Sequence, residues 1–159
     1  MQIHLIWAQD YNGGIGKLNN LPWNISEDLK NFKLLTLNST IIMGRKTWDS
    51  LPFKPLPNRR NIVLSSQRIP GIEVYNDYNS CYNSLISNSI DKVFIIGGSS
   101  IYKLFFNSAD YLHITFVDLE VKGIDLFFPY LSNDIEQSFF KESQKKLNDV
   151  ALYTFWSKK

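Results

Sequence analysis

Apolar residues recur along this chain with two periods, one typical of strands and the other of helices. Short runs rich in β-branched and aromatic residues predict strands at 3–8, 40–43, 61–65, 72–75, 92–96 and 111–117. Between these runs, apolar residues at helical spacing predict helices at 26–36, 46–51, 80–87 and 99–107. This alternation predicts crossover helices packed over a largely parallel sheet.

The C-terminal part of the chain has a different pattern. Segments 139–144 and 150–157 flank the polar turn 145–149, and this arrangement predicts an antiparallel hairpin at a sheet edge. No internal repeat, Pro/Ser-rich linker or charge block divides the sequence, and 159 residues fit one domain. We therefore predict a single α/β domain over residues 1–159 with a mixed, mainly parallel sheet.

One carboxylate interrupts the apolar face of the first predicted helix. At about 100° per residue, Ile25, Leu29, Phe32 and Leu35 form one stripe, and Asp28 falls on it between Ile25 and Phe32. Burying an unpaired carboxylate is costly, so an inward Asp28 indicates a polar ligand or a proton that offsets the cost. An acid in the first turn also favours the positive end of the helix dipole, and the residues alone leave both interpretations open.

Glycines mark two junctions where a predicted strand runs into a helix. One junction is Gly97-Gly98-Ser99, and the other is Gly44-Arg45-Lys46-Thr47. Glycine lets the backbone approach a ligand, and free amides at a helix start attract anions. A tight turn or a solvated helix start explains either junction alone. Two such junctions in one short sheet favour an extended polyanionic ligand.

A long loop at 10–23 contains three glycines and ends at the helix that carries Asp28. Loops of this length in compact domains are usually lids or binding segments. The loop therefore predicts a closing, water-excluding site beside Asp28.

Composition excludes several classes of partner. A formal net charge of +2, with scattered basic residues, argues against a nucleic-acid surface. The single cysteine, Cys81, and the isolated His4 and His113 predict no metal site, and we interpret both histidines as structural. No apolar run approaches the ~18 residues of a spanning helix, and the N-terminus lacks a basic leader. We expect a soluble cytoplasmic protein with no membrane partner.

Taken together, these motifs resemble dihydrofolate reductase in its bacterial chromosomal form. The similar segments are Ile15-Gly16, Leu21-Pro22-Trp23, Asp28 with Leu29 and Phe32, Met43-Gly44-Arg45-Lys46-Thr47-Trp48, Pro55-Leu56-Pro57-Asn58-Arg59-Arg60-Asn61, Leu64-Ser65-Ser66, Ile96-Gly97-Gly98 through Tyr102, Thr115 and Phe127-Phe128-Pro129. The resemblance covers essentially the whole chain. It implies about eight strands with helices on both faces, a monomer, and NADPH-dependent reduction of 7,8-dihydrofolate to 5,6,7,8-tetrahydrofolate by hydride transfer. It also implies inhibition by diaminopyrimidine and pteridine antifolates.

The resemblance assigns the chemistry to Asp28, which would bind the amino-pyrimidine edge of the pterin with support from Thr115 and promote protonation of the ring nitrogen. Tyr102 would lie near the nicotinamide, and Leu21 and Trp23, from the mobile lid at 9–24, complete the catalytic set. The pterin and benzoyl walls are assigned to Ile6, Leu29, Phe32, Leu51, Leu56 and Ile96. Arg59 would bind the glutamate α-carboxylate, for which a planar guanidinium is the fitting partner.

The resemblance distributes the cofactor over a larger set of residues. Backbone groups of Ala8 and Ile15 would hold the carboxamide, and the helix start at 97–102 would hold the diphosphate. The phosphates and the adenosine ribose are assigned to Arg45, Lys46, Thr47, Ser65 and Ser66. The remaining cofactor-binding residues are Gly16, Gly44, Leu64, Gly97, Gly98, Ser99, Ser100, Ile101 and Tyr102.

Three positions depart from the family pattern. Ser100 stands where many bacterial members place a basic residue near the cofactor phosphates, which leaves the strictness of the preference for NADPH over NADH open. Asn58 replaces a frequent glycine before Arg59, a tolerable change because Asn also adopts positive φ. Ile124 is an extra residue after Gly123, so the resemblance does not determine the lid contacts around the following aspartate.

Two other functions fit parts of the pattern. A reductase of the same fold acting on a riboflavin-pathway pyrimidine would share the sheet and the cofactor site, but the Leu21-Pro22-Trp23 segment joined to Asp28 argues against it. A non-catalytic dinucleotide-binding module would keep Gly97-Gly98 and Arg45 but would have no need of Asp28.

Overall fold

The computed structural model describes residues 1–159 and contains one eight-stranded sheet. Its strands are β1 (Gln2–Asp10), β3 (Thr40–Gly44), β4 (Arg60–Leu64), β5 (Glu73–Tyr75), β6 (Lys92–Ile95), β7 (Tyr111–Val117), β9 (Phe139–Lys146) and β10 (Ala151–Lys158). Their spatial order is β5-β4-β3-β6-β1-β7-β10-β9. All pairings from β5 to β7 are parallel, whereas β10 pairs antiparallel with β7 and with β9. The predicted mixed sheet with a C-terminal antiparallel hairpin is confirmed.

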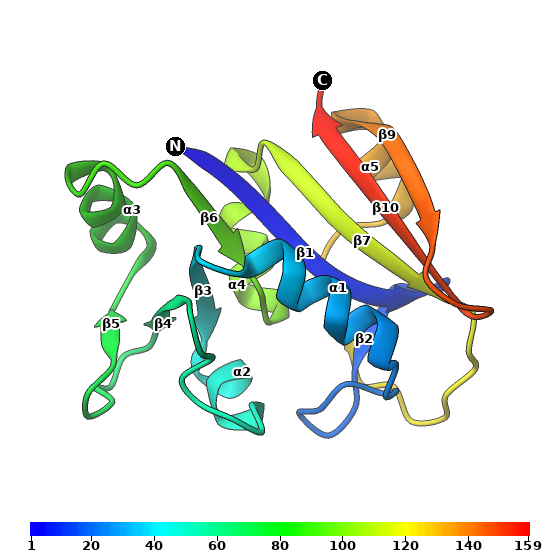
Figure 1. Ribbon diagram of the computed structural model, residues 1–159, viewed down its shortest axis with the longest axis horizontal. Helices are drawn as coiled ribbons and strands as arrows, with labels where there is room; N and C mark the ends of the chain where they lie inside the picture. Colours follow the sequence, from blue (N-terminus) through cyan, green and yellow to red (C-terminus); the bar gives the residue numbers. More distant parts are fainter.

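Helices cover both faces of this sheet. They are α1 (Ser26–Thr36), α2 (Arg45–Ser50), α3 (Tyr78–Ser87), α4 (Ser99–Phe105) and α5 (Ser132–Ser138), with a short 3-10 helix, η1 (Phe106–Ser108), after α4. In Figure 1, α1 crosses the near face of the sheet, while α4 and α5 lie behind it. The bounds of α1 match the sequence prediction, whereas α5 was not predicted because its short segment has only one buried residue, Ile135.

Alternation along β1 distributes its side chains between the two faces. Leu5 and Trp7 belong to the large core cluster with residues of α3 and α4. Ile6 lies on the other face, in a cluster with Met43 and Trp48 against which residues of α1 pack. This period of two is the ordinary consequence of strand geometry. It directs Ile6 toward the α1 side of the sheet, where the site described below is found.

The predicted loop at 10–23 contains regular structure. Strand β2 (Gly14–Gly16) pairs antiparallel with β8 (Leu126–Phe127) in a separate two-stranded sheet. The carboxylate of Asp10 accepts hydrogen bonds from the backbone amides of Asn12 and Gly14, each at 2.8 Å, and so closes the turn into β2. The predicted loop therefore contains a short strand that the sequence did not reveal, because the pairing partner of β2 lies more than a hundred residues away.

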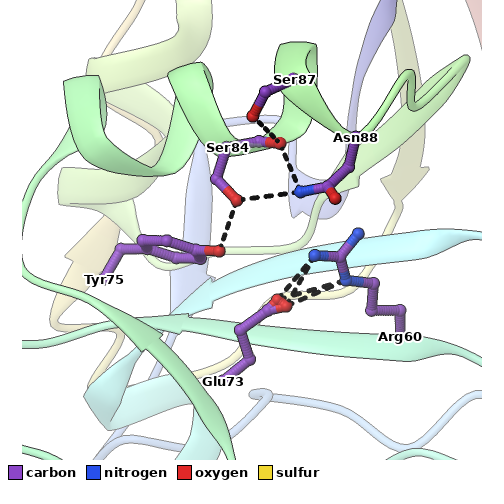
Figure 2. Close-up of polar contacts among 6 residues, drawn as sticks. All are labelled: Arg60, Glu73, Tyr75, Ser84, Ser87 and Asn88. Atoms are coloured by element: carbon purple, nitrogen blue, oxygen red, sulfur yellow. Dashed lines mark hydrogen bonds and ion pairs between the residues drawn. The ribbon is translucent and has the colours of Figure 1, made fainter.

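A polar network fixes the edge strand β5 (Figure 2). The guanidinium of Arg60 donates to both oxygens of the Glu73 carboxylate at 2.8–3.2 Å. The hydroxyls of Tyr75 and Ser84 are hydrogen-bonded at 2.7 Å, which links β5 to α3. Asn88 extends the network by donating to the Ser84 carbonyl at 2.7 Å. Arg60 is thereby committed to a structural ion pair.

No helix of the structure combines the length and apolar character needed to cross a membrane. No group of three or more His, Cys, Asp or Glu residues is placed to hold a metal ion.

Candidate active site

A cleft of about 2020 Å³ lies along the carboxyl ends of the parallel strands, between α1 on one side and the starts of α2 and α4 on the other. Open α/β sheets bind ligands at this edge. All the predicted site residues line this cleft except Ser65, Ser66 and Gly97. The structure therefore brings together residues from eight different strands and helices that the sequence pattern could only place one by one.

Gly97 lies directly behind the cleft wall. Its carbonyl accepts a hydrogen bond from the Gly44 amide at 2.8 Å, so the two glycine junctions predicted from the sequence are physically joined. Gly97 has a φ of 122°, and a Cβ there would lie 3.2 Å from the Tyr102 hydroxyl oxygen. Glycine is required here by both backbone conformation and space. The peptide between Gly97 and Gly98 is cis.

Ser65 and Ser66 follow the end of β4 and lie outside the cleft lining. The Ser65 amide donates to the Tyr75 carbonyl at 3.0 Å, and its hydroxyl accepts from the Gln67 amide at 3.1 Å. Ser65 is half-buried and Ser66 is exposed, just beyond the carboxyl end of β4.

Asp28 is half-buried on the cleft side of α1, as the helical stripe predicted. Burial raises the pKa of its carboxyl above the usual value, and hydrogen bonding from Thr115 opposes part of this effect. No cation pairs with it, because the three ion pairs of the chain involve other acids. The cost of burying the group is therefore left for a ligand or a proton to offset.

Trp23 contributes a second unsatisfied group to the same end of the cleft. Its indole Nε1 is the only buried side-chain nitrogen or oxygen without a hydrogen-bond partner. Such groups are rare in folded proteins and usually have a partner that the chain itself does not supply. An N–H donor and a carboxylate thus both line a cleft whose walls are otherwise largely apolar.

Tyr102 is buried beneath the floor of the cleft. Its hydroxyl donates to the Ile6 carbonyl at 2.8 Å, and burial raises the pKa of the phenol far above its usual value. The phenol therefore keeps its proton at neutral pH. Asp28, by contrast, is a carboxyl in the same cleft whose pKa is raised by burial.

The apolar stripe of α1 is less buried than its periodicity suggests. Ile25 is buried, but 47% of the Leu29 surface is exposed, and Phe32 is half-buried. Both Leu29 and Phe32 line the cleft, so their exposed surface faces its open interior. The stripe of α1 therefore forms a wall of the cleft and not the floor of a core.

Arg59 lies at the α1 end of the cleft. Its guanidinium donates to the Pro57 carbonyl at 2.9 Å and to the Thr36 hydroxyl at 3.2 Å, and partial burial lowers its pKa. Neither partner is charged, so the cation is oriented without being neutralised. Asn58, before it, has a φ of 58°, as its side chain was expected to permit.

The opposite end of the cleft is cationic and framed by glycines. Arg45, Lys46 and Thr47 open α2, and Gly98 and Ser99 open α4. Arg45 also forms an exposed ion pair with Asp49 at 3.1 Å. The free amides and cations at this end suit an extended anionic ligand.

The lid segment is held by the loop that contains Gly123. The Asp125 carboxylate accepts from the Leu18 amide at 3.1 Å, and the Asp125 amide donates to the Gly16 carbonyl at 3.1 Å. A Cβ on Gly123 would lie 3.1 Å from the Lys17 side chain. The lid and its partner loop therefore meet in spite of the additional residue Ile124.

The sequence reasoning did not assign two neighbouring residues with ionisable side chains to the cleft. His113 and Tyr153 line the cleft beside Thr115, on β7 and β10. The period of two along β7 was the available signal, because residues 113 and 115 must share a face. The partner strand β10 could not be aligned with β7 from the sequence alone.

These two ends fit a flat, hydrogen-bonding heterocycle beside Asp28 and an anionic nucleotide beside Arg45. The fold and the site define an α/β enzyme that uses a nucleotide cofactor to act on a small heterocyclic substrate.

The family model for dihydrofolate reductase matches residues 2–157. A dihydrofolate reductase of Buchnera aphidicola is 46% identical over 132 residues, which cover 81% of this chain and 80% of the relative. One of Neisseria gonorrhoeae is 39% identical over 162 residues, covering 98% and 96%. The structure of dihydrofolate reductase from Enterococcus faecalis, complexed with NADP(H) and RAB-propyl, superposes with a TM-score of 0.83 at 28% identity, covering 99% of this chain and 96% of that one.

The chain belongs to the dihydrofolate reductase family. It is an NADPH-dependent oxidoreductase that reduces dihydrofolate to tetrahydrofolate. The family, fold class, activity and cofactor predicted from the sequence are confirmed.

Proposed function

We propose that Asp28 binds the amino-pyrimidine edge of dihydrofolate and promotes protonation of the ring nitrogen next to the carbon that is reduced. The observation that carries this proposal is an unpaired, half-buried carboxylate in the cleft whose pKa is raised by burial. A carboxyl group with a raised pKa retains a proton closer to neutral pH and is better suited to acid catalysis. Thr115 supports the group by hydrogen bonding.

The cofactor end of the cleft fits NADPH. Arg45, Lys46 and Thr47 would bind its phosphates together with the start of α4 at Gly98 and Ser99, because this end combines free amides with positive charge. Ala8 and Ile15 would hold the carboxamide through their backbone groups. When bound, NADPH supplies the electron pair that reduces the pterin. The lining positions of Leu64, Ser100 and Ile101 support the same placement, whereas Ser65 and Ser66 have no such support.

The remaining wall residues would position the substrate and exclude water from it. The pterin and benzoyl rings are proposed to contact Ile6, Leu29, Phe32, Leu51, Leu56 and Ile96, all of which line the cleft. Arg59 would bind the glutamate α-carboxylate, since its guanidinium is oriented by neutral partners and has no acid beside it. Leu21 and Trp23 would close over the rings with the lid.

The proposal is tested by mixing the purified protein with NADPH and following the loss of cofactor absorbance in the near ultraviolet. Absorbance should fall on addition of dihydrofolate, and a diaminopyrimidine antifolate should abolish the change. The same assay with NADH measures how strictly the enzyme prefers NADPH with a serine at position 100. Turnover of a riboflavin-pathway pyrimidine without turnover of dihydrofolate would reverse the assignment.

We also propose that residues 1–159 act as one domain and as a monomer in the cytoplasm. The cleft is lined along its length by groups of a single chain, so the proposed site does not need a residue from a second copy. Pteridine antifolates should compete for the Asp28 end of the cleft as diaminopyrimidines do. Sedimentation at micromolar concentration and cell fractionation test the monomer and its location.

A further inference from the structure

Four side chains form a hydrogen-bonded row from the cleft to the outer surface of the sheet. The Tyr153 hydroxyl lies 2.7 Å from His113 Nδ1, and His113 Nε2 lies 2.9 Å from His4 Nδ1. His4 Nε2 lies 3.4 Å from the Gln2 side-chain oxygen. Tyr153 and His113 line the cleft, whereas Gln2 is exposed. The row crosses three adjacent strands, β10, β7 and β1.

Both imidazoles in the row are neutral at physiological pH. Burial lowers the pKa of His4 to about 4 and that of His113 to about 3. The charge of Lys92 contributes to the lowered pKa of both rings, His4 contributes to that of His113, and Asp110 partly opposes the effect at His4. A neutral imidazole carries one N–H donor and one bare nitrogen acceptor. If one nitrogen of a ring donates a hydrogen bond, the other nitrogen of that ring must accept one.

Gln2 fixes that direction. Its amide is oriented with the oxygen toward His4 Nε2, and this oxygen only accepts hydrogen bonds, so His4 donates from Nε2 and accepts at Nδ1. His113 must then donate from Nε2 and accept at Nδ1. The Tyr153 hydroxyl must in turn donate its single proton to His113. Its oxygen has only lone pairs left for the cleft.

We propose that Tyr153 is a specificity-determining residue that presents a hydrogen-bond acceptor, and no donor, to the heterocycle bound beside Thr115. Tyr153 is the cross-strand partner of Thr115, and both residues line the cleft together with Asp28. The group selected is a ring N–H or an exocyclic amino group of an aminopyrimidine. A ring oxygen at that point would meet lone pairs and be disfavoured. Gln2, His4 and His113 act as positioning residues.

The first test measures the tautomers of the two histidines by 15N NMR of the ligand-free protein at pH 7. Both rings should be protonated at Nε2, and the variant Gln2→Glu, which keeps an acceptor at this surface position, should leave them so. The variant Gln2→Met, which removes the acceptor, should yield a mixture of tautomers. Protonation at Nδ1 in the wild type, or an unchanged spectrum in Gln2→Met, would overturn the proposal.

The second test measures ligand affinity and rests on the proposed placement of the heterocycle. We compare a 2,4-diaminopyrimidine antifolate with two analogues, each lacking one exocyclic amino group. Tyr153→Phe should weaken binding of the parent by roughly 3- to 10-fold, the range of one neutral hydrogen bond. It should not weaken binding of the analogue that lacks the amino group bonded to Tyr153. Tyr75→Phe, which removes a hydroxyl that bonds Ser84 at the sheet edge, is the matched control and should change none of the affinities.

Equal loss for all three ligands, or no loss for the parent, would contradict the role of Tyr153. A failure of the proposed substrate placement is recognised separately, because Asp28→Asn would then leave the affinity of the parent ligand unchanged. The histidine tautomers do not depend on either outcome.

Discussion

Arg59 and Arg60 are adjacent in the chain but have opposite electrostatic surroundings. Arg60 is neutralised by Glu73 at 2.8 Å on the sheet edge, whereas Arg59 points into the cleft and contacts only the neutral oxygens of Pro57 and Thr36. An oriented cation without a counter-ion is a binding site for a carboxylate. Arg60 therefore stabilises the fold, whereas Arg59 is available to bind the substrate.

Replacing Arg59 by Ala should raise the KM for dihydrofolate by roughly 10- to 100-fold, because a charge-assisted hydrogen bond is worth about 1.5–3 kcal/mol. Its effect on kcat should be small, since the carboxylate lies far from the reacting carbon. Steady-state kinetics at saturating NADPH measure both constants. Arg60→Ala is the control: it should leave the KM unchanged and lower the melting temperature by roughly 2–4 °C per kcal/mol lost. Equal effects of the two substitutions on the KM would contradict the assignment of Arg59 to substrate binding and of Arg60 to the fold.

The ion pair between Arg45 and Asp49 should restrain cofactor binding. Arg45→Ala removes a cation from the phosphate end and should weaken NADPH binding by about tenfold. Asp49→Asn frees Arg45 and should strengthen binding by about twofold, since an exposed i,i+4 pair is worth about 0.3–0.5 kcal/mol. Fluorescence titration with NADPH measures both. Changes of the same sign in the two variants would be inconsistent with this account.

Asp28 should reduce the stability of the protein at neutral pH. Its pKa is raised in the folded state, so the folded protein binds a proton more tightly than the unfolded chain, and stability falls as pH rises from the unfolded pKa through the folded one. Asp28→Asn should therefore be more stable than the wild type at pH 7, and this advantage should vanish below about pH 4, where the wild-type carboxyl is protonated in both states. Urea denaturation at several pH values measures the difference. A constant difference across pH would show that the carboxyl is not the cause.

His4 and His113 should make the protein sensitive to acid. Their pKa values are lowered to about 4 and about 3 from 6.5, so the unfolded chain takes up protons first. The stability that these neutral rings contribute is present above pH 6.5 and is lost progressively as pH falls toward 3. In the variant His113→Asn the free energy of unfolding should depend less steeply on pH between these limits. An identical slope in the variant would contradict the assignment.

Periodicity predicted the parts of the structure that depend on local pattern. The bounds of α1 and the place of Asp28 on its apolar stripe followed from helical spacing, and the mainly parallel sheet with its C-terminal hairpin followed from the order of elements. Features that join distant segments were not predictable. The pairing of β2 with β8, the hydrogen bond between Gly44 and Gly97, and the alignment of Tyr153 with Thr115 all depend on tertiary contacts.

The site likewise has features that could be predicted from the sequence and features that depend on tertiary contacts. Resemblance supplied the identities of its residues, and nearly all of them line one cleft, but it did not show that Ser65 and Ser66 would lie outside the lining. The burial of residues just after a strand depends on the path that the chain takes to the next element. For Ser65 and Ser66 that next element is β5. A residue-by-residue transfer of roles cannot include that information.

The central claim is that Asp28 promotes protonation of the bound pterin. The most direct measurement is the rate of NADPH-dependent reduction of dihydrofolate by Asp28→Asn and by the wild type between pH 5 and 9. We predict that the variant is slower by about 10²–10⁴-fold at pH 7, the usual contribution of a positioned acid or base. The deficit should shrink toward low pH, where the substrate is already protonated in solution. Equal rates for the two proteins across this range would contradict the account.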